Sequence, residues 1–384
     1  MTDATTPAPR ASLYWSLLLP GLGHAVERLW MRALVFWLLL VPLAGTLYAA
    51  VSRGRLAWLA YHASTSPGEY WFSTTMLFIL FALVWLFAFL DLARRRARIL
   101  RGEVFHTQGY WQIVTRRFSK DVKGIIGLSL ILVTVLIALF APFYARGNGL
   151  SMDLVSFLGP PSAAHPLGQD NYGRDVLDRL IYGTRVALGI GAVATLLNII
   201  FGGFLGLVGG YFRGVADAII MRALEIINSI PFLVLVLLIV SLWGSSVITL
   251  ILVLGIFGLQ PARIIRSEVL SVREEDYVLA ARAIGVPTYR ILYRHVLPNA
   301  IATLLVVTSM YIGVNIIVVA GLSFLGFGVR PPTPSWGSML QQAQDFMRTA
   351  WWMAVYPGLC IIITVFGFNI LGDSLRDVLD PRLK

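Results

Sequence analysis

Long apolar runs separated by shorter polar segments organise this chain of 384 residues. About eight of them approach or exceed the roughly 20 apolar residues that an α-helix needs to cross a bilayer. They fall at about 29–51, 70–92, 124–144, 186–211, 218–241, 245–263, 299–325 and 351–373. No strand-like alternation of apolar and polar residues is visible. Because backbone polar groups in lipid must be satisfied within each segment, the pattern predicts an all-α transmembrane fold.

The composition changes how the charge of the chain is interpreted. Hydrophobic residues make up 57% of the chain and charged residues only 13%, which excludes a soluble domain of this length. The formal net charge is +11. Lys and Arg mark the cytoplasmic loops of membrane proteins, so the excess indicates topology, and we predict a lipid membrane and no nucleic acid as a partner.

Three basic clusters follow this rule. One lies between the second and third runs, one precedes the seventh run, and one follows the last run: Arg94, Arg95, Arg96, Arg98, Arg101, Arg116, Arg117, Lys120 and Lys123; Arg263, Arg266, Arg273, Arg282, Arg290 and Arg294; Arg376, Arg382 and Lys384. Eight spans with a cytoplasmic N-terminus put all three clusters, and the C-terminus, in the cytoplasm. One span more or fewer in the first hundred residues would move the N-terminus alone.

The first basic cluster divides the chain. We predict an N-terminal extension with about two transmembrane helices over 1–92, a basic cytoplasmic linker over 93–123 and a core over 124–384. The single cysteine, Cys360, lies in the last run, which excludes a disulfide framework and a thiolate metal site.

A polar segment over 264–298 separates the sixth run from the seventh. Good helix formers fill 274–284, and Gly285 is placed to cap that helix. A second short helix, with Thr288 as its cap, is expected to end at Pro298. Taken alone, the segment is most simply a loop whose basic residues fix topology. A basic helix–turn–helix between two spans also suits docking of a soluble partner.

The spacing of small and apolar residues in this segment decides between these interpretations. Five residues fall on the spacing of the coupling loop of ATP-binding-cassette (ABC) importer permeases, which contains Glu-Ala-Ala, Gly and Ile-x-Leu-Pro: Ala280, Ala281, Gly285, Leu297 and Pro298. Leu279 replaces the family's Glu and His295 its Ile, as is common among peptide-type permeases. The segment therefore resembles a coupling loop.

Further motifs follow in the family's order over about two thirds of the chain. They lie at 165–175, 179–185, 209–217, 323–328, 331–337 and 369–382. Together they resemble the second permease subunit of dipeptide, oligopeptide and nickel importers. Residues 1–119 do not match that family's usual short N-terminus, so the role of the extra helices is open.

The resemblance implies a type I ABC importer permease core of about six helices plus about two extra N-terminal spans. It implies a multi-pass protein of the bacterial inner membrane that forms half of a translocation path for peptides. The implied partners are a homologous second permease, one or two ATPases and an extracytoplasmic substrate-binding protein. The residues implied to couple to the ATPase are Glu274, Asp276, Tyr277, Ala280, Ala281, Arg282, Gly285, Arg290, His295 and Pro298.

Catalytic motifs do not occur in the sequence. There is no G-x-x-x-x-G-K-[ST] phosphate loop, no H-E-x-x-H and no G-x-S-x-G. We therefore expect no catalytic residue, no metal site and no bound cofactor in this chain. ATP and Mg²⁺ would be bound by partner ATPase subunits.

The segment 146–180 carries several polar side chains. His165, Asp170 and Asp175 could suggest a metal site, but their spacing is not diagnostic. We favour a structural role in which Arg174 pairs with the aspartates. Contact of Asp170 and Arg174 with the binding protein is a second use.

The segment 335–350 has apolar residues at near-helical spacing, with glutamines between them. This pattern predicts an amphipathic helix at the outer membrane face. Such a helix would pack on the permease, and Trp336 is a candidate for contact with the binding protein.

A few polar residues lie inside the apolar runs. Asn315 and Asn228 are the candidates for the translocation path, since buried polar groups in membrane helices face the protein interior or a cavity. Glycines between 202 and 210 favour close helix packing.

Other classes of function are weighed against the importer. A nickel or other metal-chelate importer permease shares the same motifs. An ion-coupled secondary transporter would show interrupted helices in symmetric halves and ionisable groups at midplane, which we do not find. An intramembrane enzyme would need paired His, Asp or Ser residues at membrane depth, and none is evident.

Overall fold

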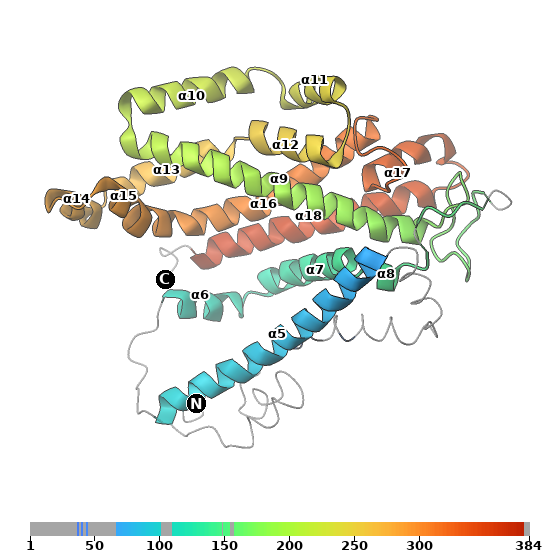
Figure 1. Cartoon of the computed structure of the whole chain (residues 1–384), viewed down its shortest axis with the longest axis horizontal. Coiled ribbons are helices and arrows are strands. Elements are labelled where there is room, and N and C mark those ends of the chain that lie inside the picture. The colour runs from blue at the N-terminus through green and yellow to red at the C-terminus, as the bar shows by residue number, and fades with distance from the viewer. Residues whose placement is uncertain are drawn as a thin grey trace. The chain divides into compact units, whose positions relative to one another are not determined.

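The computed structural model describes residues 37, 40, 44, 67–100, 110–147, 149–153 and 157–379. Within these residues the regular elements are helices, apart from an isolated antiparallel bridge between Gln169 and Asp175 (Figure 1). Five helical segments are long and apolar enough to cross a membrane, and a bent helix pair brings the number to six. The described part of the chain is thus an all-α membrane protein, as predicted.

The helices follow one another in this order: α5 (Pro67–Leu100), α6 (Tyr110–Phe118), α7 (Val122–Leu139), α8 (Ala141–Tyr144), α9 (Val176–Phe212), α10 (Gly214–Asn228), α11 (Phe232–Trp243), α12 (Val247–Phe257), α13 (Pro261–Arg273), α14 (Asp276–Ala283), α15 (Thr288–Ile291), the π-helical turn η1 (Leu292–Val296), α16 (Leu297–Phe324), α17 (Trp336–Ala343), the 3₁₀ turn η2 (Gln344–Phe346) and α18 (Trp352–Leu379).

Most predicted spans are helices, with boundaries that differ. The spanning segments are Val122–Leu139, Val176–Phe212, Val247–Arg273, Thr288–Phe324 and Trp352–Leu379. The prediction for 70–92 falls within α5, whose apolar portion is Ile79–Ala93. The prediction for 29–51 lies outside the described residues, apart from 37, 40 and 44.

One expectation needs correction. The span predicted over 218–241 is a pair of helices, α10 and α11, that meet at 77°. Pro231 lies at this break, where it lacks a backbone donor and disfavours helix in the residue before it. Within the predicted linker over 93–123, the described residues include the end of α5 at Leu100 and the whole of α6 from Tyr110, and the linker role stays a prediction.

The contacts divide the chain into two compact units. The first contains residues 1–120 and 132–148, and the second contains residues 121–131 and 149–384. In the first unit, Val84 of α5 packs with Leu136, Phe140 and Phe143. The predicted boundaries at 92 and 123 separate the N-terminal extension, the linker and the permease core. The division into compact units does not test them, so they stay predictions.

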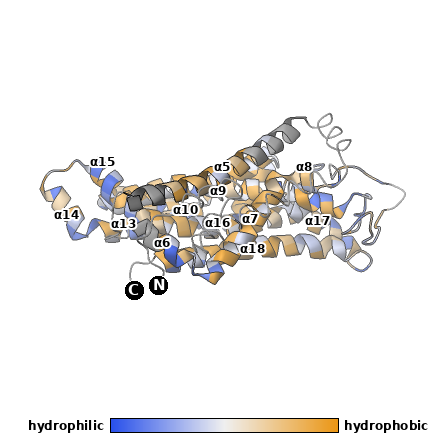
Figure 2. Cartoon of the chain, turned by 90° about the horizontal axis from the view of Figure 1, so that it is seen from below, coloured by the Kyte–Doolittle hydropathy of each residue, from blue (hydrophilic) through white to orange (hydrophobic). Residues whose placement is uncertain are grey.

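Helix α9 is the centre of the second unit, where it contacts α12, α13 and α16. One core cluster brings together Ile190 of α9, Val236 of α11, Leu250 and Leu254 of α12, and Leu322 of α16. Figure 2 shows apolar residues along α9, α16 and α18, with hydrophilic residues gathered toward α13–α15 and toward α17. These helices thus combine an apolar middle with polar ends, as a lipid environment requires.

A seam of glycines joins α9 to α13. Gly202, Gly206 and Gly210 recur every fourth residue and face the backbone of α13. A Cβ atom at Gly206 would lie 2.5 Å from the carbonyl oxygen of Ala262, and one at Gly210 would lie 2.9 Å from that of Arg266. The close helix packing predicted from these glycines is confirmed, and it joins α9 and α13 backbone to backbone.

The two ends of α9 carry different structures (Figure 1). We call the part formed by residues 209–217 and 264–299 the α14 end. We call the part formed by residues 165–180 and 335–353 the α17 end. Both belong to the second compact unit.

Candidate functional site

The α14 end is built around a short helix closed by glycine. Helix α14 ends with a Schellman motif, in which the N–H groups of Gly285 and Val286 donate to the carbonyls of Arg282 and Ala281 at 3.1 Å each. Gly285 has φ +77°, which a residue with a side chain adopts at a cost. The predicted capping role of Gly285 is confirmed.

The second helix of this end differs from the prediction. Pro287, in extended conformation, precedes α15, and Thr288 is its first helical residue rather than its cap. The chain then stays helical through η1 into α16, so the second helix does not end at Pro298. The wide turn of η1 accommodates Pro298, which has no N–H to donate in the following helix.

A small apolar core holds α14 in place. Val278 and Ala281 are buried on its inner face against Tyr211 of α9 and Val269 of α13, with Ile291 of α15 in the same cluster. Two alanines of α14, Ala280 and Ala281, are among the residues implied to couple to the ATPase. Ala281 packs inside the chain, and Ala280 alone of this pair is exposed.

The outer surface of the α14 end is apolar to an unusual degree for a polar loop. Five large side chains are exposed there: Tyr277 (43%), Leu279 (42%), Ile284 (81%), Tyr289 (67%) and Tyr293 (76%). We call these five the α14 patch. Exposed aromatic and aliphatic side chains grouped in this way mark interaction surfaces.

Basic side chains surround the α14 patch. Arg282, Arg290 and Arg294 are exposed, and no carboxylate of the described residues forms an ion pair with them. Arg290 lies over the ring of Tyr289, 5.9 Å from its centroid. Apolar contact area with cationic groups at its edge suits an acidic-rimmed groove on a partner.

The remaining predicted coupling residues lie at the edges of this surface. Glu274 accepts a hydrogen bond from Arg213 at 2.9 Å, and Asp276 opens α14. The Tyr277 hydroxyl accepts from Asn299 at 3.0 Å, and the Tyr277 ring lies 6.2 Å from that of His295. Partial burial, with the nearby Glu275 charge, raises the pKa of Tyr277, so the hydroxyl stays neutral near pH 7.

The α17 end has the opposite character, because its charges are buried. Asp170 is 3% exposed, Arg174 4% and Arg179 2%. Arg174 Nε donates to Asp170 Oδ2 at 2.7 Å, and Arg179 Nε lies 3.4 Å from the same oxygen. Both arginines donate to Gln342 Oε1 of α17, at 3.0 Å and 3.4 Å.

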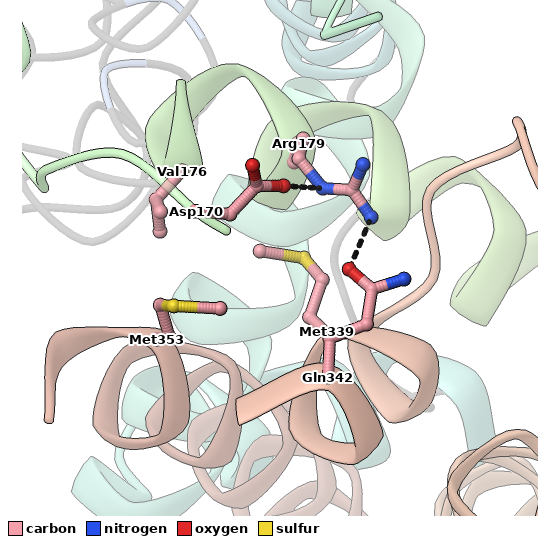
Figure 3. Close-up of a pocket in the computed structure, with 6 residues that line it drawn as sticks. All are labelled: Asp170, Val176, Arg179, Met339, Gln342 and Met353. Atoms are coloured by element: carbon pink, nitrogen blue, oxygen red, sulfur yellow. Dashed lines mark hydrogen bonds and ion pairs between the residues drawn. The ribbon is translucent and has the colours of Figure 1, made fainter. Parts of the chain in front are cut away.

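Figure 3 shows the small pocket beside these groups, which is closed below by methionines of α17 and α18. Its lining residues are Asp170, Val176, Arg179, Met339, Gln342 and Met353. Two tryptophans hydrogen-bond to the neighbouring backbone. The Trp336 indole donates to the Leu180 carbonyl of α9, and the Trp352 indole donates to the Gln169 carbonyl, each at 3.1 Å. This end is fixed by contacts within the chain.

The three residues predicted to contact the binding protein, Asp170, Arg174 and Trp336, have buried side chains, with Trp336 only 3% exposed. Their docking role stays a prediction. The structural role favoured for the polar loop agrees with the contacts. His165 pairs with Asp175 at 2.8 Å, while the Asp170 carboxylate is occupied by the arginines.

The helix predicted over 335–350 is shorter than expected. It comprises α17 and the turn η2, and the chain leaves the helix before Trp352. Gln342 faces inward to the arginines rather than outward to water. Sequence periodicity missed this, because a glutamine on an amphipathic helix is usually placed on the polar face.

The two residues predicted to line the translocation path, Asn315 and Asn228, lie in different environments. Asn315 is 4% exposed, and its amide donates to Thr195 Oγ1 at 2.8 Å and to Asn198 Oδ1 at 3.0 Å. Asn198 donates in turn to the Leu254 carbonyl at 2.8 Å. These bonds join α9, α12 and α16, so the contacts of Asn315 are those of packing, and its path role stays a prediction. Asn228 accepts from Gln260 at 2.8 Å near the α10–α11 break.

One residue of the α14 end was not identified from the sequence. Tyr211, in the last turn of α9, lies under the guanidinium groups of both Arg273 and Arg282. Its place in the 209–217 motif was the available signal.

Comparisons with known proteins agree with this arrangement. The family described as binding-protein-dependent transport system inner membrane component matches residues 198–384. The N-terminal TM domain of oligopeptide transport permease C matches residues 109–173. The first match contains the whole α14 end from Gly209 onward, and the second contains α6 to α8.

Individual relatives are similar over most of their length. The chain is 37% identical over 275 residues to the dipeptide transport system permease protein DppC of Alkalihalophilus pseudofirmus, covering 71% of this chain and 90% of the relative. It is 38% identical over 278 residues to the glutathione transport system permease protein GsiD of Pectobacterium atrosepticum, covering 71% and 92%. It is 35% identical over 275 residues to the oligopeptide transport system permease protein OppC of Bacillus subtilis, covering 71% and 90%.

These matches cover the part of the chain that carries the α14 end, the α17 end and the glycine seam. The chain therefore belongs to the family of inner-membrane permease components of binding-protein-dependent ABC transport systems, of the dipeptide and oligopeptide type.

Proposed function

We propose that this chain is one of two permease subunits of an ATP-driven peptide importer, and that the α14 end is where ATPase subunits engage it. The observation that carries the proposal is the α14 patch. Its five exposed apolar side chains lie in a polar segment between spans, rimmed by Arg282, Arg290 and Arg294. When a partner covers such a surface on a water-facing loop, the burial of apolar area stabilises the complex.

The ATPase would supply the chemistry that this chain lacks. ATP and Mg²⁺ would be bound by the ATPase subunits, and this chain would be a non-catalytic subunit that converts their closure into helix movement. Helix α14 is suited to act as a lever, because its inner face is fixed in the apolar cluster with Tyr211 and Ile291 while its outer face is exposed.

The orientation follows from this assignment. The α14 end would face the cytoplasm, which accords with its basic residues, and the α17 end would face the extracytoplasmic side. The chain would lie in a bacterial inner membrane with both termini in the cytoplasm. Residues 1–92 would form a peripheral extension beside the permease core at 124–384.

A peptide is the favoured cargo. The relatives are named for dipeptide, oligopeptide and glutathione transport. A nickel or other metal chelate remains the alternative of the same family, without an observation in its favour here. Selection of the cargo would fall largely to the extracytoplasmic binding protein.

The test is gentle affinity purification of the full chain from its native membrane, with mass spectrometry of the proteins that accompany it. We expect a second permease and one or two ATPases with phosphate-loop motifs. Recovery of the chain alone, or of a homo-oligomer without an ATPase, would contradict the proposal. Purification of the Ile284→Glu variant sharpens the test, because a charge in the α14 patch should release the ATPase and leave the second permease bound.

A further inference from the structure

The turn between α9 and α10 is tied to the α13–α14 junction at several points. Tyr211, which is 6% exposed, is the last aromatic residue buried in α9. The guanidinium carbons of Arg273 and Arg282 lie 5.7 Å and 5.5 Å from the centroid of its ring. Arg273 also donates to the Tyr211 carbonyl, and Arg213 pairs with Glu274.

The two arginines come from different helices. Arg273 is the last residue of α13, and Arg282 lies in the last turn of α14. Cations within about 6 Å of a ring centroid are attracted to its face, more strongly where the site is shielded from water. A single aromatic ring therefore holds both sides of the α13–α14 junction against the end of α9.

The turn itself has little freedom to absorb movement. Helix α10 begins directly after Arg213, and both Arg213 and Gly214 have positive φ, at 57° and 56°. Asp217 in the first turn of α10 accepts two hydrogen bonds from Arg266 of α13, at 2.5 Å and 2.6 Å. A carboxylate held by two guanidinium N–H groups fixes orientation as well as distance.

We propose that Tyr211 is the positioning residue through which movement of α14 passes into the α9–α10 turn. This inference rests on the proposed function, because it requires an ATPase that moves α14. When α14 tilts, Arg282 moves with it, and the ring that Arg282 shares with Arg273 of α13 moves the end of α9. The glycine seam at Gly206 and Gly210 then makes α9 and α13 move together. The α10–α11 break at Pro231 is the hinge that accommodates the displaced turn.

The experiment measures movement of the turn directly and needs no identified cargo. The full complex with its ATPases is placed in nanodiscs with Cys360→Ser as background. Spin labels are attached at Val215→Cys, next to the turn, and at Met347→Cys in the α17 end. Val215 is 76% exposed and Met347 52%, so labels fit at both positions. The distance between the labels is compared without nucleotide and after trapping with ATP and vanadate.

We expect nucleotide trapping to shift the distance in the otherwise unaltered chain and in Tyr211→Phe, which keeps the ring. We expect Tyr211→Leu, which keeps apolar volume without a ring, to lose the shift while the ATPases stay bound. Arg273→Gln should reduce the shift, and Arg273→Lys should restore it, since an ammonium group also binds a ring face.

A matched variant separates this role from general stability. Leu250→Ala removes volume from the separate core cluster of α9, α11, α12 and α16 and leaves Tyr211, Arg273 and Arg282 intact. It should lower thermal stability and keep the shift. A normal shift in Tyr211→Leu, or no shift in the unaltered complex, would overturn the inference while the bound ATPases still support the proposed function. Absence of ATPases from the purified complex would instead contradict the proposed function.

Discussion

The two ends of α9 differ in which side chains they bury and which they expose. At the α17 end, the charged groups of Asp170, Arg174 and Arg179 are almost completely buried. At the α14 end, apolar groups such as Ile284 and Tyr293 are more than three quarters exposed, at 81% and 76%. The first end pairs its buried charges within the chain, although Nε and Nη1 of Arg179 lack a hydrogen-bond partner among the described residues, and the second leaves apolar groups uncovered. The comparison teaches that the α17 end is a fixed structure and the α14 end is an incomplete one.

The physical reason lies in the cost of each arrangement. A buried charge is tolerated only when paired and hydrogen-bonded, so Asp170, which holds two arginines, must keep its geometry in every state of the protein. Leaving an apolar group exposed costs little folding free energy, but covering it with a partner lowers the free energy of the complex. The Arg213–Glu274 ion pair at the α14 end is half exposed and easily exchanged for water.

The largest expected effect is loss of the carboxylate at the α17 end. Asp170→Asn should leave two buried guanidinium groups without a counter-charge, and breaking a buried pair in this way costs about 3–5 kcal/mol. Thermal unfolding of the purified protein in detergent measures the effect. The counterpart at the α14 end, Glu274→Gln, should cost about 0–1 kcal/mol, because its pair with Arg213 is exposed. Equal losses in the two variants would break the comparison.

The next effect concerns the seam that joins the two ends. Gly206→Ala places a Cβ atom 2.5 Å from the Ala262 carbonyl oxygen, where backbone must shift. Overpacking of this kind costs about 1–3 kcal/mol. Gly189→Ala is the matched control, since it lies in the same helix with nothing within 4 Å of the new Cβ atom. Unfolding temperatures should fall for Gly206→Ala only, and a normal value for that variant would show that α9 and α13 are not in close contact.

The smallest effect is a pH dependence at the α14 end. The pKa of Tyr277 is raised above 10.0 by partial burial and by Glu275. The proton is thus held more tightly in the folded loop than in the unfolded chain, so the contribution of Tyr277 to stability is complete below pH 10.0 and is lost as the pH rises through its folded pKa. An ultraviolet difference titration of the protein against Tyr277→Phe should show no ionisation of this residue below pH 10.0. Ionisation well below that value would contradict the described partial burial of the Tyr277 hydroxyl beside Glu275.

Much of the α14 end could be predicted from the sequence, because its geometry depends on local rules. Gly285 caps α14 through the φ value that glycine tolerates. The glycines of the seam were also recognisable by their four-residue spacing. The predicted cap Thr288 failed for a local reason, since Pro287 already holds the extended conformation that precedes a helix.

What the sequence could not predict at the α17 end has a tertiary cause. Charged residues and an amphipathic pattern are usually solvated, yet the side chains of Asp170, Arg174 and Trp336 are buried. Arg174 and Arg179 both donate to Gln342, which lies more than 160 positions along the chain from them. The same applies to Asn315, whose partners Thr195 and Asn198 lie on α9. No local pattern encodes such pairings.

The most direct test of the central claim is cross-linking from the α14 patch. In a Cys360→Ser background, Ile284→Cys and Met347→Cys place one reactive thiol at the α14 end or at the α17 end, on side chains that are 81% and 52% exposed. A thiol-anchored photo-cross-linker is then activated in native membranes. We predict that Ile284→Cys captures an ATPase subunit and that Met347→Cys does not. Capture of the ATPase from Met347→Cys, or its absence from Ile284→Cys, would contradict the assignment of the α14 end as the docking surface.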